Sequence, residues 1–208
     1  MSKKKNKIIA IFIALFVLIG CFFIFNSMNT KNSNKSLEGK IEAVSGLPSD
    51  YKSFKIQING KLYNMPLSVE KIEKLGFSPV ISYDDSQISS STLTTDTYEY
   101  FSSTQKSKIE VGFYNPTNDT LKVKDCKIST ILVKQEQVND DSAEIVFPGG
   151  VQIGSTFKKV QNAYGEYDET YNGEKYNVYT WKSTEQNLVK IYIDKTTQRV
   201  IEMYMQKI

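Results

Sequence analysis

The hydrophobic pattern divides the chain into one long apolar run and many short segments in which apolar and polar residues alternate. The run extends from Ile8 to Phe25 and holds no charged or strongly polar side chain. A helix over these residues is roughly 27 Å long at about 1.5 Å per residue, close to the ~30 Å hydrocarbon core of a bilayer. The pattern therefore predicts a transmembrane helix over residues 8–25.

The same run has a second interpretation, which depends on Cys21. The residues from Leu18 to Cys21 resemble the lipobox at which bacterial lipoprotein signal peptides are cut and lipidated. Phe22 to Phe25 continue the apolar run, whereas lipoproteins usually become polar at this point. An uncleaved helix and a lipid anchor on Cys21 both stay open, and each attaches the chain to a lipid bilayer.

The residues on either side of the run predict its orientation. Residues 1–7 contain four lysines and no acidic residue, so the positive-inside rule makes them a basic cytoplasmic start. Residues 26–40 are polar and poor in core-forming side chains, which predicts a flexible linker. We therefore expect a single-pass protein whose C-terminal part is extracytoplasmic.

Residues 41–135 have the pattern of a small helix on an antiparallel sheet. Apolar and polar residues alternate on both sides of Asn59-Gly60, a pair typical of a type I′ hairpin turn. A short helix is predicted between a cap at Ser68 and Gly76. Further strands are expected at 98–101, 108–114, 120–124 and 128–134.

Residues 142–208 show a similar order of elements. A helix is predicted between a cap at Ser155 or Thr156 and a stop at Gly165. The later strands place apolar side chains on one face and polar ones on the other. The inward set is Val189, Ile191 and Ile193, continued by Ile201, Met203 and Met205, and the outward set is Lys190, Tyr192 and Asp194.

These patterns together predict an α+β protein, with an N-terminal transmembrane helix followed by an ectodomain of two small helix-on-antiparallel-sheet halves. The halves are 41–135 and 142–208, separated by a polar segment, and their similar order suggests a loose internal duplication. In each half the helix is expected to cover the inner face of the sheet and leave the outer face in water.

Charge and composition remove several classes of function. Four of the 26 basic residues precede the apolar run, so the remaining 22 are balanced by 23 acidic residues, and the only arginine is Arg199. Nucleic acid is therefore not an expected partner. The chain has no histidine, which excludes Ser-His-Asp and Cys-His sites. Cys126 is expected to be a buried strand or turn residue.

Two motifs invite a catalytic or ligand-binding interpretation. The segment from Gly149 to Thr156 nearly matches a phosphate-binding loop, but Ser155 replaces the lysine that such a loop requires, so we interpret its glycines as turn and close-approach positions. The acidic clusters are expected to be solvated turns that bind no metal or other cofactor. They are Asp84-Asp85, Asp140-Asp141 and the acidic residues of 166–169.

Tyrosines in the C-terminal strands give the candidate binding surface. Aromatic residues make up 12% of the chain, and several of them lie on adjacent predicted strands. Tyrosine stacks well on ligands while keeping its hydroxyl in water, although it is also a common strand residue. On the outward side we expect Tyr192 and Tyr204 to form the face that binds a partner.

Two resemblances accompany these patterns. The segment from Gly154-Ser155-Thr156 through Tyr164-Gly165 to the strand around Ile193 resembles the SmpA/OmlA (BamE-like) lipoproteins and the β-lactamase inhibitor protein fold. From Leu47 onward, the chain resembles uncharacterised exported lipoproteins of Gram-positive bacteria. The resemblance implies a binding or assembly module and carries no catalytic residues.

The sequence therefore predicts a membrane-anchored, extracytoplasmic module that binds an envelope protein or a cell-wall component and is not an enzyme. The alternative is a cell-wall hydrolase that uses two carboxylates. Such an enzyme needs two acidic side chains roughly 5 to 9.5 Å apart in a cleft.

Overall fold

The computed structural model describes residues 41–208 except for 84–85, 105 and 138–142. Several sequence-based predictions lie outside these residues and are not examined by the structure. They are the basic start at 1–7, the membrane span at 8–25 with Cys21, the linker at 26–40, and the pairs Asp84-Asp85 and Asp140-Asp141. Within the described part of the chain, no helix has the length and apolar content that a bilayer span requires.

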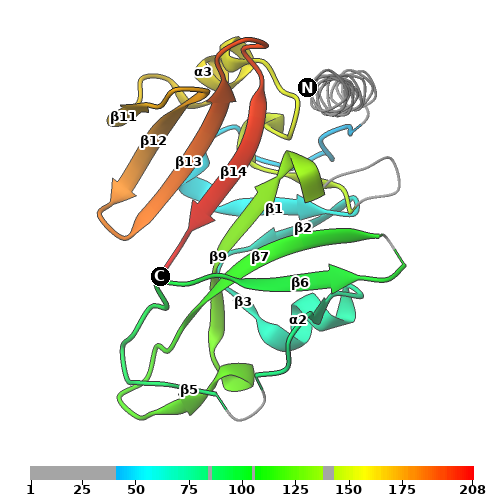
Figure 1. Ribbon diagram of the computed structural model, residues 1–208, viewed down its shortest axis with the longest axis vertical. Helices are drawn as coiled ribbons and strands as arrows, with labels where there is room; N and C mark the ends of the chain where they lie inside the picture. The colour runs from blue at the N-terminus through cyan, green and yellow to red at the C-terminus, as the bar shows by residue number, and fades with distance from the viewer. Residues whose placement is uncertain (1–40, 84–85, 105, 138–142) are drawn as a thin grey trace, which may run out of the picture. The chain divides into compact units, whose positions relative to one another are not determined.

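Residues 39–208 form one compact unit that is built around a large antiparallel sheet (Figure 1). In spatial order the strands of this sheet are β11 (Glu169–Asn172), β12 (Tyr176–Thr184), β13 (Asn187–Asp194), β14 (Val200–Gln206), β9 (Lys127–Lys134), β7 (Ser107–Tyr114), β6 (Tyr98–Ser102) and β4 (Ser78–Pro79). The short strand β3 (Leu67–Ser68) also pairs with β9.

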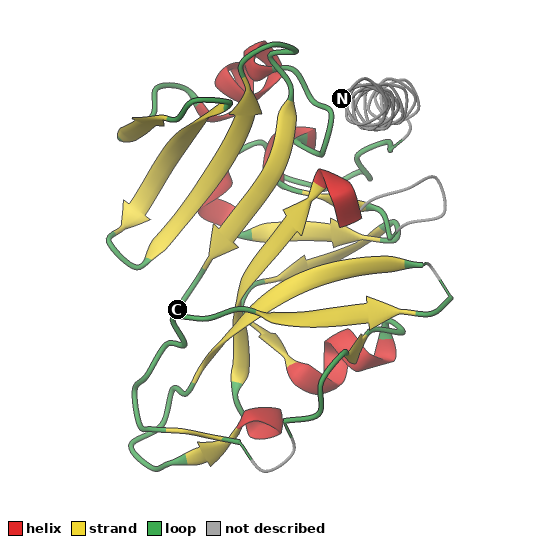
Figure 2. Cartoon of the chain, in the orientation of Figure 1, coloured by secondary structure: helices red, strands yellow, loops and turns green. Residues whose placement is uncertain are grey.

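The remaining elements are short (Figure 2). A three-stranded sheet has the order β10 (Ile145–Val146), β1 (Lys55–Ile58) and β2 (Lys61–Asn64), and β5 (Gln87–Ile88) pairs with β8 (Leu121–Lys122). The two described α-helices are α2 (Val69–Lys74) and α3 (Phe157–Tyr164). Single 3₁₀ turns are η1 (Tyr51–Ser53), η2 (Val123–Asp125), η3 (Gln135–Gln137) and η4 (Pro148–Gly150).

One face of the large sheet forms the core. Trp181 on β12 is fully buried, and its ring lies 5.3 Å from that of Tyr164 on α3. Tyr100 on β6 is also buried, and burial, with a smaller contribution from Glu73 on α2, raises the pKa of its hydroxyl. Both helices therefore pack on the same side of the sheet, which we call the covered face.

The prediction of an α+β fold made of two small helix-on-antiparallel-sheet halves is wrong, because the chain is mostly β and one sheet runs through both halves. The join is the pairing of β14 with β9, in which Met203 faces Val133 and Met205 faces Ile131. Strand β9 has strands on both sides, and six consecutive residues, 128–133, are buried. A nearly continuous buried run is typical of an interior strand.

Several local predictions are confirmed. Asn59 and Gly60 both have positive φ, as a type I′ turn requires, and they connect β1 to β2. Thr156 caps α3, because its side chain accepts a hydrogen bond from the Lys159 N–H at 3.2 Å. Ser68 lies at the start of α2 as expected but makes no side-chain cap bond.

One predicted core position is corrected. A β-bulge shifts the register between β13 and β14, so that Ile193 faces Val200 and Tyr192 faces Glu202. Val200 is therefore fully buried, whereas Ile201 lies in the bulge and is only half-buried. Simple alternation cannot predict the extra residue that a bulge inserts.

Candidate functional site

The candidate site lies on the side of the large sheet opposite the helices. Residues directly paired across antiparallel strands share a face, so the strand register defines two adjoining rows there. One row is Tyr171, Val178, Tyr192, Glu202 and Lys134, and the other is Glu169, Thr180, Lys190, Tyr204, Leu132, Glu110 and Glu99. We call the surface formed by these two rows the open face.

The structure places Tyr192 and Tyr204 together on the open face, both of them half-buried. The Tyr192 ring lies 5.6 Å from the ring of Tyr176, and the Lys190 ammonium lies 5.5 Å from the centre of the Tyr204 ring. Burial raises the pKa of Tyr192 to about 12, with Glu202, Tyr176 and Tyr204 adding to the rise. The Tyr192 hydroxyl is therefore neutral at physiological pH and can donate a hydrogen bond. The Tyr204 hydroxyl already donates to the Gln206 side-chain oxygen at 2.5 Å, so its ring is the part left for a ligand.

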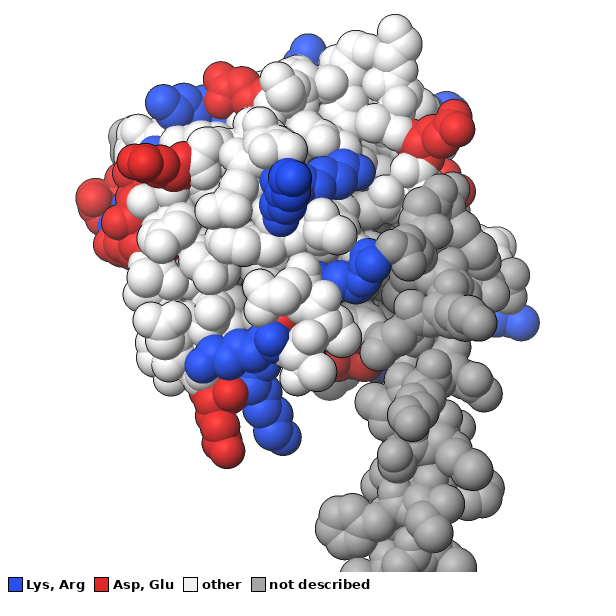
Figure 3. Space-filling model, turned by 90° about the horizontal axis from the view of Figure 1, so that it is seen from above, with Lys and Arg blue, Asp and Glu red and all other residues white. Residues whose placement is uncertain are grey.

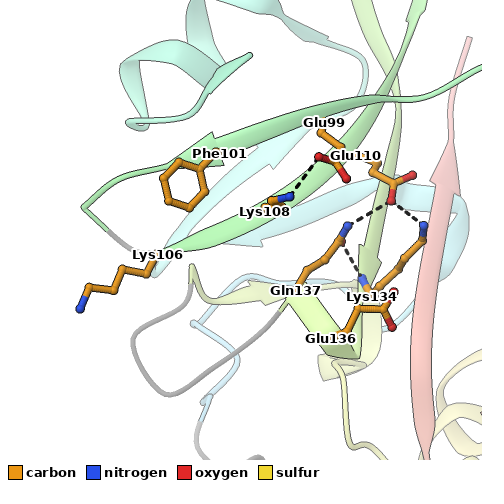
Figure 4. Close-up of a pocket in the computed structure, with 8 residues that line it drawn as sticks. All are labelled: Glu99, Phe101, Lys106, Lys108, Glu110, Lys134, Glu136 and Gln137. Atoms are coloured by element: carbon orange, nitrogen blue, oxygen red, sulfur yellow. Dashed lines mark hydrogen bonds and ion pairs between the residues drawn. The ribbon is translucent and has the colours of Figure 1, made fainter. Parts of the chain in front are cut away.

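Glu110 anchors a polar network further along the same face, where Leu132 on β9 separates it from Tyr204 (Figure 4). One carboxylate oxygen accepts hydrogen bonds from the Lys134 ammonium at 2.5 Å and the Gln137 amide at 3.0 Å, and the other accepts from the Thr97 hydroxyl at 2.7 Å. Burial alone raises the pKa of Glu110, but these bonds outweigh it and hold the pKa below its ordinary value. Glu110 is therefore a fixed carboxylate whose two oxygens are both bonded.

Glu202 has a different environment although it lies on the same face. It is half-buried between Tyr192 and Lys134, its cross-strand neighbours, and it makes no hydrogen bond or ion pair with any residue that the structure describes. Burial raises its pKa, Glu110 and Glu136 raise it further, and Lys134 offsets only part of this. Glu202 therefore has carboxylate oxygens that a ligand can approach.

A groove adjoins this region at the other end of the same rows (Figure 4). Its volume is about 350 Å³, and it is lined by Glu99, Phe101, Lys106, Lys108, Glu110, Lys134, Glu136 and Gln137. Lys108 pairs with Glu99 at 3.1 Å, while Lys106 extends away from the Glu110 network. The groove is lined by side chains of both charges and by the ring of Phe101, so it suits a ligand that has both polar and apolar groups.

The other candidate residues have structural roles. Cys126 is buried, and burial together with Asp125 raises the pKa of its thiol, as expected for a residue that does not react. Gly149 has a φ of 70°, and an added Cβ would approach Ala163 of α3 to 2.4 Å. That turn glycine is therefore needed for close packing, in agreement with the sequence-based interpretation.

The acidic residues of 166–169 lie at the start of β11 and are exposed. Asp168 accepts a hydrogen bond from the Lys182 N–H at 2.6 Å, and Glu169 pairs with the Lys182 ammonium at 2.7 Å. These two contacts connect β11 to β12, and both acidic side chains remain exposed to solvent. Across the described residues, no group of histidine, cysteine or acidic side chains is arranged to hold a metal ion.

The sequence patterns predicted the two tyrosines but not the charged residues on the neighbouring strands of the same face. Three strands carry these residues: β7 carries Glu110, β9 carries Lys134 and β14 carries Glu202. The residues are brought together because β9 pairs with both β7 and β14. Period-two alternation did predict that Tyr192 shares a face with Lys190. The same alternation in residues 202–205 predicts that Glu202 and Tyr204 lie on one face of the sheet and Met203 and Met205 on the other.

Figure 3 shows lysines and acidic residues scattered among neutral ones on the side that it views, without a large area of either sign. Comparison of the chain with protein-family models, curated proteins and solved structures finds no match. The resemblances to BamE-like and exported lipoproteins therefore stay predictions.

Proposed function

We propose that the protein is a non-enzymatic binding module of the cell envelope that uses the open face to hold an envelope protein or a cell-wall component. The observation that carries the proposal is the placement of Tyr192 and Tyr204 around Glu202, a half-buried carboxylate with no bonded partner in the described structure. Aromatic rings offer flat apolar contact, and hydroxyl and carboxylate groups offer directional hydrogen bonds. This combination suits the amide and hydroxyl groups of peptides and glycans.

We propose further that this module works outside the cytoplasm and is attached to the membrane by residues 8–25, either as a helix or through a lipid on Cys21. The apolar run and the lysines before it support this location. Mass spectrometry of the mature N-terminus distinguishes the two anchors. Protease treatment of intact spheroplasts should digest residues 39–208, and recovery of the full-length chain in the cytosol would contradict the location.

The binding proposal is tested by photocrosslinking in intact cells. A crosslinking amino acid is placed at Tyr192 or at Tyr204, and at Tyr63 as a control. Tyr63 is also half-buried, but it lies on β2 of the three-stranded sheet and contacts Lys71. We expect one partner to be captured from both open-face positions and not from Tyr63. Capture of nothing, or of the same products at all three positions, would contradict the proposal.

The double variant Tyr192→Ala, Tyr204→Ala provides a second measurement. It should reduce retention of the full-length protein on isolated cell-wall sacculi, or on the captured protein, by roughly tenfold. Each stacked aromatic ring contributes about 0.5 to 1.5 kcal/mol beyond its buried area, and about 1.4 kcal/mol is a factor of ten. The variant Tyr63→Ala should bind like the parent. Thermal unfolding of each variant shows that any loss of binding is not a loss of folding.

The carboxylate-dependent hydrolase stays the second candidate, because one observation favours it. Glu202 has a raised pKa and Glu110 a lowered one, and paired carboxyl groups with opposite shifts are typical of acid and base roles. Against it, both Glu110 oxygens are already bonded to neighbouring side chains. Release of sugar from cell walls by the parent protein, abolished in Glu202→Gln, would establish the enzyme, whereas binding without release supports the module.

A further inference from the structure

The two edges of the large sheet are built differently. At one edge, β4 has only two residues and one of them is Pro79, a residue that blocks further strand pairing. At the other edge, β11 has four residues, Glu169 to Asn172, without a proline, a lysine or a glycine. No described strand pairs with the outer side of β11, which lies at the end of the sheet in Figure 1.

Exposed aromatic side chains gather at the β11 edge. Tyr167, Tyr171 and Tyr176 are the tyrosines among the exposed large apolar residues of the described chain, and all three lie in β11 or next to it. Tyr171 is 65% exposed. Large exposed apolar side chains grouped around an unpaired strand are typical of an interaction surface.

The hydrogen bonding of β11 shows which backbone groups point outward. The Gly173 N–H donates to the Tyr176 carbonyl at 2.9 Å, and bonding residues alternate along an antiparallel pair. Glu169 and Tyr171 therefore direct their N–H and C=O groups toward β12. Thr170 and Asn172 direct theirs away from the sheet, toward the open side of the edge.

These outward groups allow β11 to pair with itself. In an antiparallel pair centred on Tyr171, Thr170 of one copy faces Asn172 of the other, and the two exchange both backbone hydrogen bonds. Glu169 then faces Gly173, so no like charges are opposed within β11; the next pair outside the strand, Asp168 and Glu174, is acidic on both sides and weakens the pairing. The two Tyr171 residues face each other as a non-hydrogen-bonded pair, with their Cα atoms about 4.5 Å apart.

We propose that two copies of this chain pair through β11 and extend the large sheet across a two-fold axis at Tyr171. Directly opposed residues share a face, so the open faces of the two copies lie on the same side of the joined sheet. Four strand residues and their neighbouring tyrosines bury less than the ~1,200 Å² of a stable standard interface. The dimer is therefore weak in dilute solution and forms where the chain is concentrated.

Disulfide crosslinking of the full chain in membrane vesicles tests this pairing. Tyr171→Cys should form a disulfide-linked dimer under mild oxidation, because the expected Cα separation matches disulfide geometry. Thr196→Cys is the control, since Thr196 is exposed in the turn between β13 and β14. The parent protein gives the background from Cys21 and Cys126.

Charge pairs test the register in the Tyr171→Cys background. Adding Thr170→Lys and Asn172→Lys opposes lysines at two places across the axis and should reduce dimer formation roughly tenfold. Adding Thr170→Lys and Asn172→Glu opposes lysine to glutamate and should restore it. Thermal unfolding of both combinations checks that β11 still pairs with β12.

Crosslinking of Tyr171→Cys that is blocked by the two lysines and restored by the lysine–glutamate pair supports self-pairing. Equal dimer yields from Tyr171→Cys and Thr196→Cys would overturn it, as would disulfides formed only with another protein. These outcomes are independent of the open-face variants, because Tyr192 and Tyr204 do not take part in the pairing. If no dimer is detected, the proposal that the open face binds a partner is therefore not contradicted.

Discussion

The two faces of the large sheet are made by the same strands and yet do different things. On β13, Ile191 is fully buried on the covered face, while the next residue, Tyr192, is half-buried on the open face. The covered face is apolar and packed under α3, whereas the open face carries tyrosines and charged groups. A shift of one residue along a strand therefore moves a side chain from the core to the proposed binding surface.

The largest expected effect comes from replacing neighbours on opposite faces. Ile191→Ala should lower the free energy of unfolding by about 2 to 5 kcal/mol, because it leaves a cavity in the core. Tyr192→Ala should cost about 1 kcal/mol, as a partly exposed residue loses less contact. Denaturant unfolding measures both changes, and equal losses would contradict the division between the faces.

A smaller effect is expected from Glu110, an open-face carboxylate that accepts hydrogen bonds from three side chains. Glu110→Ala removes the partner of Lys134, Gln137 and Thr97 at a site that is only 8% exposed. We expect a loss of about 1 to 3 kcal/mol, since buried polar groups then lack their bonds. Denaturant unfolding at neutral pH gives the value, and Glu136→Ala, at an exposed position, is the control.

The free energy of unfolding should depend on pH in opposite directions for Glu202 and Glu110. The pKa of Glu202 is raised in the folded state, so its contribution is present at acidic pH and is lost as the pH rises through the folded pKa. Glu202→Gln should therefore gain stability relative to the parent as the pH rises above the ordinary glutamate value of about 4.3. Unfolding curves between pH 4 and pH 7 measure the difference.

Glu110 should behave in the opposite way. Its folded pKa is lowered, so its contribution is present above the ordinary value and is lost as the pH falls through the folded pKa. The deficit of Glu110→Gln relative to the parent should thus shrink in acid. Parallel pH profiles for the two variants would show that the environments of the two carboxylates are alike.

The smallest effect is expected at Lys190, whose ammonium lies over the Tyr204 ring. Lys190→Met keeps the length of the side chain and removes the charge, so the loss should be about 0.5 to 1 kcal/mol or less. Thermal unfolding measures it, and a stronger effect would show that the open face contributes more to stability than its exposure indicates.

Much of the local structure could be predicted from the sequence. Asn59-Gly60 specified a turn because few residues adopt positive φ, and Thr156 specified a helix start because its side chain can bond a free backbone N–H. Alternation placed Tyr192 and Ile191 on opposite faces. These signals are local, and each is set by one or two residues.

The arrangement of the sheet could not be predicted in the same way. The pairing of β14 with β9 joins residues that are far apart in the chain. The sequence of neither strand indicates which other strand it will pair with. The sequence of β9 offers only a short apolar run, Ile131 to Val133, which is a weak sign of an interior strand. Glu202, Lys134 and Glu110 were missed as a group because their proximity depends on that pairing.

The position of β14 also bears on how the molecule is assembled. Strand β9 is synthesised well before residues 200–206, so the edge that β14 pairs, from Thr130 to Lys134, stays uncovered until β14 emerges and docks, although β3 already pairs with Lys127 and Ile128. Contacts between distant segments slow folding, and an uncovered interior strand can pair with other chains in the meantime. Newly made chains are therefore most vulnerable to aggregation along β9, and a chaperone that shields an apolar strand would act there.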